Sequence, residues 1–317
     1  METNYIISEI EINENELNND IRIINSFEQY KRGDKTIRDK EGDKKYQNEK
    51  EIITNCKIFI NENEIPFSYF SKFPKEGKYT IKYVFLSNIK KTVCMFCHCE
   101  KITSIDLSNF YSKQLENMNS MFYGCKNLLQ INFNNFDFQN ITDFGNLFNK
   151  CQSLKYIDLS NLKNNKVSNL CCMFNECISL KYIDLSNFIT NEAINMYGMF
   201  NQCKSLINLN ISTFNTKNVN NMGCMFNGCK SLVSIDLSGF DIQNVTNISC
   251  MFYNCKSITY LDISNFNFQK VEYSSNFLNK CTSLISINMP EFNGINKKKF
   301  HIFNCYNLLF KNHVKNK

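Results

Sequence analysis

The cysteines of this chain are the residues whose spacing could carry chemistry. Nine of them come shortly after a hydrophobic pair, eight at intervals of 26 residues and the last after 24. They are Cys99, Cys125, Cys151, Cys177, Cys203, Cys229, Cys255, Cys281 and Cys305. If successive copies stack about 5 Å apart, distance alone permits disulfides or a redox array. Parallel side chains suit a disulfide dihedral poorly and the count is odd, so we expect buried thiols that fill space as small apolar groups.

A denser cluster, Cys94-Met95-Phe96-Cys97-His98-Cys99, offers a C-x-x-C pair beside a histidine. These are ligands that zinc prefers, but structural zinc sites usually use a second such pair a dozen or more residues away. The sequence has no second pair, Cys99 is a repeat cysteine, and Cys94 falls in a column of small residues. We therefore expect no metal here, because repeat packing accounts for every ligand except Cys97 and His98.

An acidic or amide residue stands seven positions after each repeat cysteine. This column comprises Asp106, Asn132, Asp158, Asp184, Asn210, Asp236, Asp262 and Asn288. Such a row could bind a partner, hold a cation, or keep an exposed strand solvated. Calcium sites need several oxygens that converge on one point, which a single-file row does not supply. The sequence therefore favours a solvated face or a partner surface over a cation site.

Two tyrosines in consecutive repeats stand two residues before this acidic column. Tyr156 and Tyr182 are expected to lie side by side on an exposed strand face. Tyrosine is enriched at protein interfaces and among the residues that dominate binding energy. We predict a partner-binding patch made of Tyr156, Asp158, Tyr182 and Asp184.

A 26-residue unit positions all of these side chains. In residues 245–266, Val245, Ile248, Met251 and Cys255 have helical spacing. The alternation that follows at 261–264 predicts a short strand, and the L-x-x-L-x-L pattern is that of a leucine-rich repeat. We predict an α/β solenoid over residues 94–317, a stack of about nine coils. Each coil has one short strand and a helical or 3-10 segment, and the last forms a degenerate C-terminal cap.

Residues 1–93 lack the 26-residue period. Apolar patterns at 6–12, 21–24, 52–60 and 79–86 predict strands, and the charged stretch near 31–50 predicts a mobile loop. We predict a small β-rich cap that covers the first coil. The alternative is an independent partner-binding domain.

Composition excludes several classes of function. The net charge of +6 comes from 36 basic and 30 acidic residues that are mixed along the chain, without the basic stripe that nucleic-acid binding requires. No run of eighteen apolar residues predicts a transmembrane helix, and the acidic N-terminus does not resemble a secretory signal. We therefore expect a cytoplasmic protein whose cysteines are thiols.

The recurring unit resembles that of BspA-like leucine-rich-repeat surface proteins. Residues 225–249 read MFNGCKSLVSIDLSGFDIQNVTNIS, and the likeness extends over residues 95–309. The resemblance implies a right-handed leucine-rich-repeat solenoid and a role in binding or adhesion, with no catalytic residues to carry over. It also implies a cell-surface location as the alternative to the cytoplasm.

The function expected from the sequence is non-enzymatic. No Ser-His-Asp set, glycine-rich phosphate loop or nucleophile elbow is visible, so we expect no catalytic residues and no cofactor. The prediction is a scaffold that binds a protein partner through a concave strand face. The alternative is a cell-surface adhesin-type protein.

Overall fold

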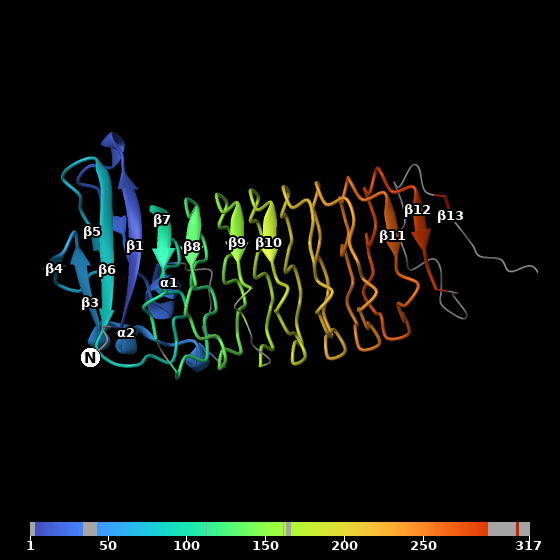
Figure 1. The fold of residues 1–317 in the computed structure, drawn as a ribbon, viewed down its shortest axis with the longest axis horizontal. Helices are drawn as coiled ribbons and strands as arrows, with labels where there is room; N and C mark the ends of the chain where they lie inside the picture. The colour runs from blue at the N-terminus through green and yellow to red at the C-terminus, as the bar shows by residue number, and fades with distance from the viewer. Residues whose placement is uncertain are drawn as a thin grey trace, which may run out of the picture.

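The computed structural model describes residues 4–33, 43–111, 113–160, 162 and 166–290, together with the backbone of Leu309–Phe310. The body is elongated: a sheet built from N-terminal strands lies at one end, and the 26-residue repeats lie side by side along the long axis (Figure 1). The predicted C-terminal cap and Cys305 lie outside the described residues.

The helices are short and precede the repeats. They are α1 (Phe27–Gly33) and α2 (Glu49–Asn55), with the 3-10 turns η1 (Glu14–Glu16) and η2 (Asp43–Lys45). The strands before the repeats are β1 (Asn4–Ile12), β2 (Ile21–Arg22), β3 (Cys56–Ile60), β4 (Asn63–Ile65), β5 (Phe70–Ser71) and β6 (Gly77–Phe85). The strands of the repeats are β7 (Ile102–Asp106), β8 (Gln130–Asn132), β9 (Tyr156–Asp158), β10 (Tyr182–Asp184), β11 (Tyr260–Asp262), β12 (Ser286–Asn288) and β13 (Leu309–Phe310).

The N-terminal strands join the first repeats in one sheet. Its order is β4-β3-β6-β1-β7-β8, in which β1 pairs antiparallel with both β6 and β7. The strand prediction was wrong for the start of 52–60, because Ile52 lies in α2 with its side chain fully buried. The division of the chain at residue 93 stays a prediction.

The α/β solenoid predicted from the sequence is wrong. The regular secondary structure of the described chain is mostly strand, in several small sheets, with two short helices that both lie outside the repeats. After β8 the repeat strands form separate sheets, β9 with β10 and β11 with β12 and β13, and no strand is present at 206–211 or 232–237. The leucine-rich-repeat assignment is likewise unsupported.

The segments predicted as helices are runs of turns. The N–H groups of Met121, Tyr123 and Cys125 donate within their own repeat, each to the carbonyl three residues earlier. The N–H groups of Ser120 and Phe122, which alternate with them, donate to carbonyls of the next repeat at 2.8 and 3.0 Å. A helix would use all of these donors internally, with a spacing of four. The apolar spacing is therefore helical, but the hydrogen bonding is not.

Left-handed backbone at two positions per repeat produces these turns. In the repeat that contains Met173, the positions are Cys172 (φ +56°) and Glu176 (φ +57°). Positive φ at the third residue of a turn is the type II geometry, which glycine adopts without strain. Glycine does occupy equivalent positions in other repeats, at Gly124 (φ +73°), Gly198 (φ +60°) and Gly228 (φ +72°).

The core is a continuous file of apolar side chains between the strand face and the turn segments. The six phenylalanine rings from Phe96 to Phe226, one per repeat, each stack on the next ring, with centroids 5.3–5.9 Å apart. The file ends where Phe252 meets Phe277 edge to face at 82°. The cysteine column from Cys99 to Cys281 is buried beside these rings, as the sequence predicts.

A polar column runs along the turn side and links the repeats. Parallel bridges join Asn117, Asp143 and Asn169 and continue to Tyr273. The buried Asp143 carboxylate accepts bonds through Oδ1 from Asn119 Nδ2 (3.0 Å), Asn169 Nδ2 (2.8 Å) and the Gly145 N–H (2.9 Å). One carboxylate thus ties three successive repeats together.

Candidate functional site

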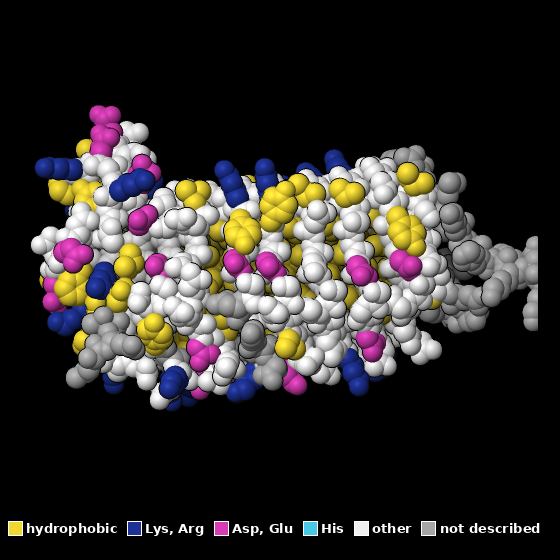
Figure 2. All heavy atoms as spheres, in the orientation of Figure 1, with side chains coloured by type: hydrophobic (Ala, Val, Ile, Leu, Met, Phe, Trp, Pro, Cys, Tyr) yellow, Lys and Arg dark blue, Asp and Glu magenta, His cyan; other side chains and the backbone are white. Residues whose placement is uncertain are grey.

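The predicted patch lies on two strands that pair in parallel. In the register of β9 and β10, Tyr182 stands opposite Tyr156 and Asp184 stands opposite Asp158. Tyr156 and Tyr182 are both 53% exposed. Ile157 and Ile183, each between the tyrosine and the aspartate of its strand, are buried in the core. On this face, Figure 2 shows acidic side chains in a row along the long axis, with hydrophobic side chains beside them and basic ones along the edge. The structure therefore brings the four predicted residues together.

The aspartates of the patch also have a local structural role. Asp158 Oδ1 accepts the N–H of Ser160, and Asp184 Oδ1 accepts the N–H of Ser186, both at 2.9 Å. These bonds close an Asx turn at the end of each strand. The hydrogen bond from Ser186 lowers the pKa of Asp184 below its usual range. Partial burial, together with the nearby carboxylates of Asp158 and Asp184, raises the pKa of the Tyr156 hydroxyl.

The repeat cysteines are poorly suited to chemistry. From Cys125 to Cys281, each repeat thiol donates to the carbonyl of a core phenylalanine 29 residues earlier, as Cys177 Sγ does to Phe148 O at 3.1 Å. Burial raises the pKa of the thiols from Cys125 to Cys255, to about 12 for Cys229, so they stay protonated. A protonated, buried thiol is a weak nucleophile and a weak metal ligand.

The C-x-x-C cluster does not converge on a point. Cys94 and Cys97 pack beneath Phe27, Tyr30 and Tyr46 of the N-terminal segment, whereas Cys99 belongs to the main core. His98 stacks on Tyr30 with ring centroids 5.8 Å apart, and burial lowers the pKa of its imidazole. No group of three or more metal-ligating side chains occurs within the part of the chain that the structure describes.

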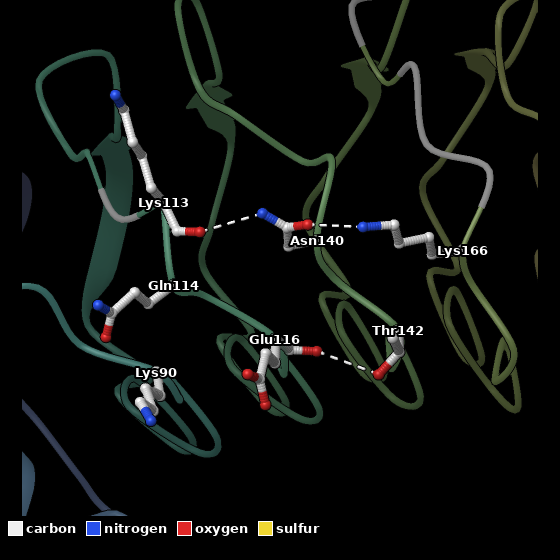
Figure 3. A pocket seen from close by; sticks show the side chains of 7 residues that line it. All are labelled: Lys90, Lys113, Gln114, Glu116, Asn140, Thr142 and Lys166. Atoms are coloured by element: carbon white, nitrogen blue, oxygen red, sulfur yellow. Dashed lines mark hydrogen bonds between the residues drawn. The ribbon is translucent and has the colours of Figure 1, made fainter.

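A groove of about 470 Å³ with polar lining residues lies along the segment from Lys90 to Lys166 (Figure 3). Its lining residues are Lys90, Lys113, Gln114, Glu116, Asn140, Thr142 and Lys166. The ammonium groups of Lys90 and Lys113 point in different directions, and that of Lys166 donates to Asn140 Oδ1 at 2.8 Å (Figure 3). Because these cations do not meet at one point, the groove lacks the converging donors of an anion site.

Sequence reasoning missed the Asx turns and one pair of adjacent thiols. The turns have a readable signal, since Asp or Asn is followed two positions later by Ser or Asn in seven successive repeats, from Asp106 to Ser264. Cys171 and Cys172 have no such signal: their sulfur atoms lie 3.7 Å apart in the turn segment of their repeat.

Comparisons with known proteins identify the repeats. A family model described as "Mycoplasma protein of unknown function, DUF285" matches residues 90–206 and 172–290, which together span more than half of the chain. No curated protein and no solved structure matches the chain. Within the described ranges, none of the helices has the length and apolar character needed to cross a membrane. By its repeats, the chain belongs to the DUF285 family.

Proposed function

We propose that this chain is a non-enzymatic interaction scaffold that binds a protein partner through the strand face of β9 and β10. The observation that carries the proposal is the pairing of Tyr156 with Tyr182, both 53% exposed on adjacent strands. Large tyrosine side chains that stay exposed on a regular strand face offer contact area without serving the core.

The rigidity of the patch supports this role. The tyrosines have only two side-chain torsions each and stand on a hydrogen-bonded strand pair, so binding would cost little conformational entropy. Asp158 and Asp184 keep one carboxylate oxygen in the Asx turn and have a second oxygen for a partner. Lys155 and Lys181, exposed just before the two tyrosines, add positive charge along the edge of the same patch.

A protein partner fits the patch better than a small molecule. Small ligands prefer concave, mostly apolar sites, whereas this face presents aromatic rings flanked by charged groups. Two other features also support a non-enzymatic role. The repeat thiols from Cys99 to Cys281 are buried, and the ammonium groups of Lys90 and Lys113 in the groove point apart (Figure 3).

The experiment is identification of the partner followed by footprinting of the face. Proximity labelling of the full chain in its own cell gives candidate partners, and hydroxyl-radical footprinting then maps each purified complex. We expect Tyr156 and Tyr182 to be protected while Tyr273, which is 60% exposed outside the repeat strands, stays reactive. Protection of Tyr273 with no change at Tyr156 and Tyr182 would overturn the proposal.

A second candidate is an adhesin-type protein of the cell surface. It is favoured by the resemblance of the repeat unit to BspA-like surface proteins, and the DUF285 match is consistent with a repeat or surface family. Labelling of intact cells with a membrane-impermeant reagent distinguishes the two: an adhesin is labelled from outside, whereas a cytoplasmic scaffold is labelled only after lysis.

A further inference from the structure

Asp158 and Asp184 bring two carboxylates together on the exposed strand face. They stand opposite each other in the parallel register of β9 and β10, and neighbouring strands of a sheet lie about 4.8 Å apart. The hydrogen bond from Ser186 lowers the pKa of Asp184 below its usual range, so this carboxylate is ionised at neutral pH. Adjacent carboxylates repel each other, and a bound positive charge relieves that repulsion.

No positive group in the described part of the chain pairs with these two carboxylates. Asp158 Oδ1 accepts the N–H of Ser160 and Asp184 Oδ1 accepts that of Ser186, and neither aspartate forms an ion pair with a described residue. The second oxygen of each aspartate is therefore left for a group from outside the chain.

Other aspartates of the same column receive donors from an amide in the next repeat. Asn132 Nδ2 donates to Asp106 Oδ1 at 3.1 Å. Asn288 Nδ2 lies 3.2 and 3.1 Å from the two carboxylate oxygens of Asp262. Between β9 and β10 both residues of the pair are aspartates, and an ionised carboxylate cannot donate. This pair is therefore the place on the face where a donor from a partner is needed.

The exposed tyrosine rings supply the apolar half of a site for a cationic side chain. Tyr156 and Tyr182, both 53% exposed, stand two residues before the aspartates and on the same face of their strands. A lysine or arginine packs its aliphatic stem against such rings, and its positive group is attracted to the ring face. Figure 2 shows acidic and hydrophobic side chains beside one another along this face.

We propose that the partner docks on this face through a basic segment. One of its lysine or arginine side chains lies across Tyr156 and Tyr182, with the positive group between Asp158 and Asp184. This inference rests on the proposed function and adds the chemistry of the partner. A basic side chain suits the pair better than a metal ion, because two carboxylates in single file offer too few converging oxygens, whereas charge-assisted hydrogen bonds need only one acceptor each.

The test is binding of a fluorescent peptide of alternating arginine and glycine to the full-length protein, measured by fluorescence anisotropy. A peptide of alternating glutamate and glycine is the probe of opposite charge. We expect the wild type to bind the arginine peptide, more weakly as salt is added, and not to bind the glutamate peptide. Asp158→Asn/Asp184→Asn should bind the arginine peptide roughly fivefold or more weakly, because both charges are removed.

The matched control is Asp236→Asn/Asp262→Asn, which removes the same charge from two adjacent repeats of the same face. We expect it to bind the arginine peptide within about twofold of the wild type. Each asparagine keeps a turn acceptor, as Asn210 does for Ser212 at 3.1 Å, so both double variants are expected to fold. Thermal melting checks this before the affinities are compared.

Equal binding of the two peptides, no binding of the arginine peptide, or an equal loss in both double variants would each refute the basic segment. Footprinting of the native complex keeps this result separate from the proposed function. Protection of Tyr156 and Tyr182, with a partner affinity that Asp158→Asn/Asp184→Asn does not change, would overturn the basic segment and leave binding through the strand face intact.

Discussion

The thiol of Cys177 donates a hydrogen bond to the backbone carbonyl oxygen of Phe148, 3.1 Å away in the preceding repeat. The same relationship recurs from Cys125 to Cys281, always over 29 residues and at 3.0–3.2 Å. Cysteine suits this position because it is small and apolar enough for the core and still donates weakly to the carbonyl. The periodic cysteines are therefore packing residues that also link neighbouring repeats.

Replacing one of these cysteines should destabilise the protein. Cys177→Ala removes the bond to Phe148 and leaves a small cavity, so we expect the free energy of unfolding to fall by about 1–2 kcal/mol. Cys250→Ala, at a partly exposed position, is the control and should change it by less than about 0.5 kcal/mol. Urea unfolding followed by circular dichroism measures both, and equal effects would contradict the packing role.

Left-handed residues in the turns should show a preference for glycine. Glu176→Gly relieves a positive φ of 57° at a position where Gly124 and Gly228 occur in other repeats, and we expect it to stabilise the fold by up to about 1 kcal/mol. Gly228→Ala should destabilise it by about 1–2 kcal/mol, because φ is +72° and the new Cβ would lie 2.5 Å from Gln202 Nε2.

The comparison for these turn variants is Gly33→Ala, where a Cβ meets no atom within 4 Å and no positive φ is required. Its melting temperature should stay close to that of the wild type. If Glu176→Gly and Gly228→Ala changed stability in the same direction, the type II turn geometry would be contradicted.

The Asp143 carboxylate should contribute more than its neighbours in the same column. Asp143→Ala removes three hydrogen bonds from Asn119, Gly145 and Asn169, and we expect a loss of about 2–4 kcal/mol in unfolding free energy. Asn195→Ala, which removes a bond to the Tyr197 N–H, should cost about 1 kcal/mol. Chemical denaturation of the two variants side by side checks this, and a smaller loss for Asp143→Ala would contradict it.

Acid should weaken the strand face through its aspartates. Hydrogen bonds from Ser186, Ser238 and Ser264 lower the pKa values of Asp184, Asp236 and Asp262 below the ordinary 3.8. Since the unfolded chain takes up these protons first, their stabilising contribution is complete above about pH 4 and is lost as the pH falls through the folded-state pKa values.

A triple variant isolates this acid effect. Changing all three aspartates to asparagine keeps a turn acceptor, as Asn210 does for Ser212, but removes the titration. Melting temperatures between pH 6 and pH 2 should fall more steeply for the wild type than for the variant. Parallel curves would show that these carboxylates do not contribute to the acid sensitivity.

The repeat period predicted which side chains lie in the core, but not how the backbone is arranged. Ile157, Leu159 and Cys151 are buried as expected, because apolar residues at a fixed register must share one interior. The segment around Met173 and Phe174 was predicted to be helical because its apolar residues are spaced three and four apart. That spacing specifies a buried face, and stacked type II turns satisfy it as well as a helix does.

The candidate site was predictable where it depends on strand alternation. Tyr156 and Tyr182 face outward because Ile157 and Ile183 face inward, and a period of two dictates this arrangement. The contact between the sulfur atoms of Cys171 and Cys172 occurs instead at a left-handed residue, since φ at Cys172 is +56°. Cysteine does not require a left-handed backbone, so this contact could not be predicted from the local sequence.

The most direct test of the central claim is the affinity of the identified partner for variants of the strand face. Isothermal titration calorimetry should give at least tenfold weaker binding for Tyr156→Ala/Tyr182→Ala than for the wild type, since buried interface tyrosines commonly contribute more than about 1 kcal/mol each. Tyr273→Ala, which changes a tyrosine that is 60% exposed outside the repeat strands, should bind within about twofold of the wild type. Unchanged affinity of a folded Tyr156→Ala/Tyr182→Ala variant would contradict binding through β9 and β10.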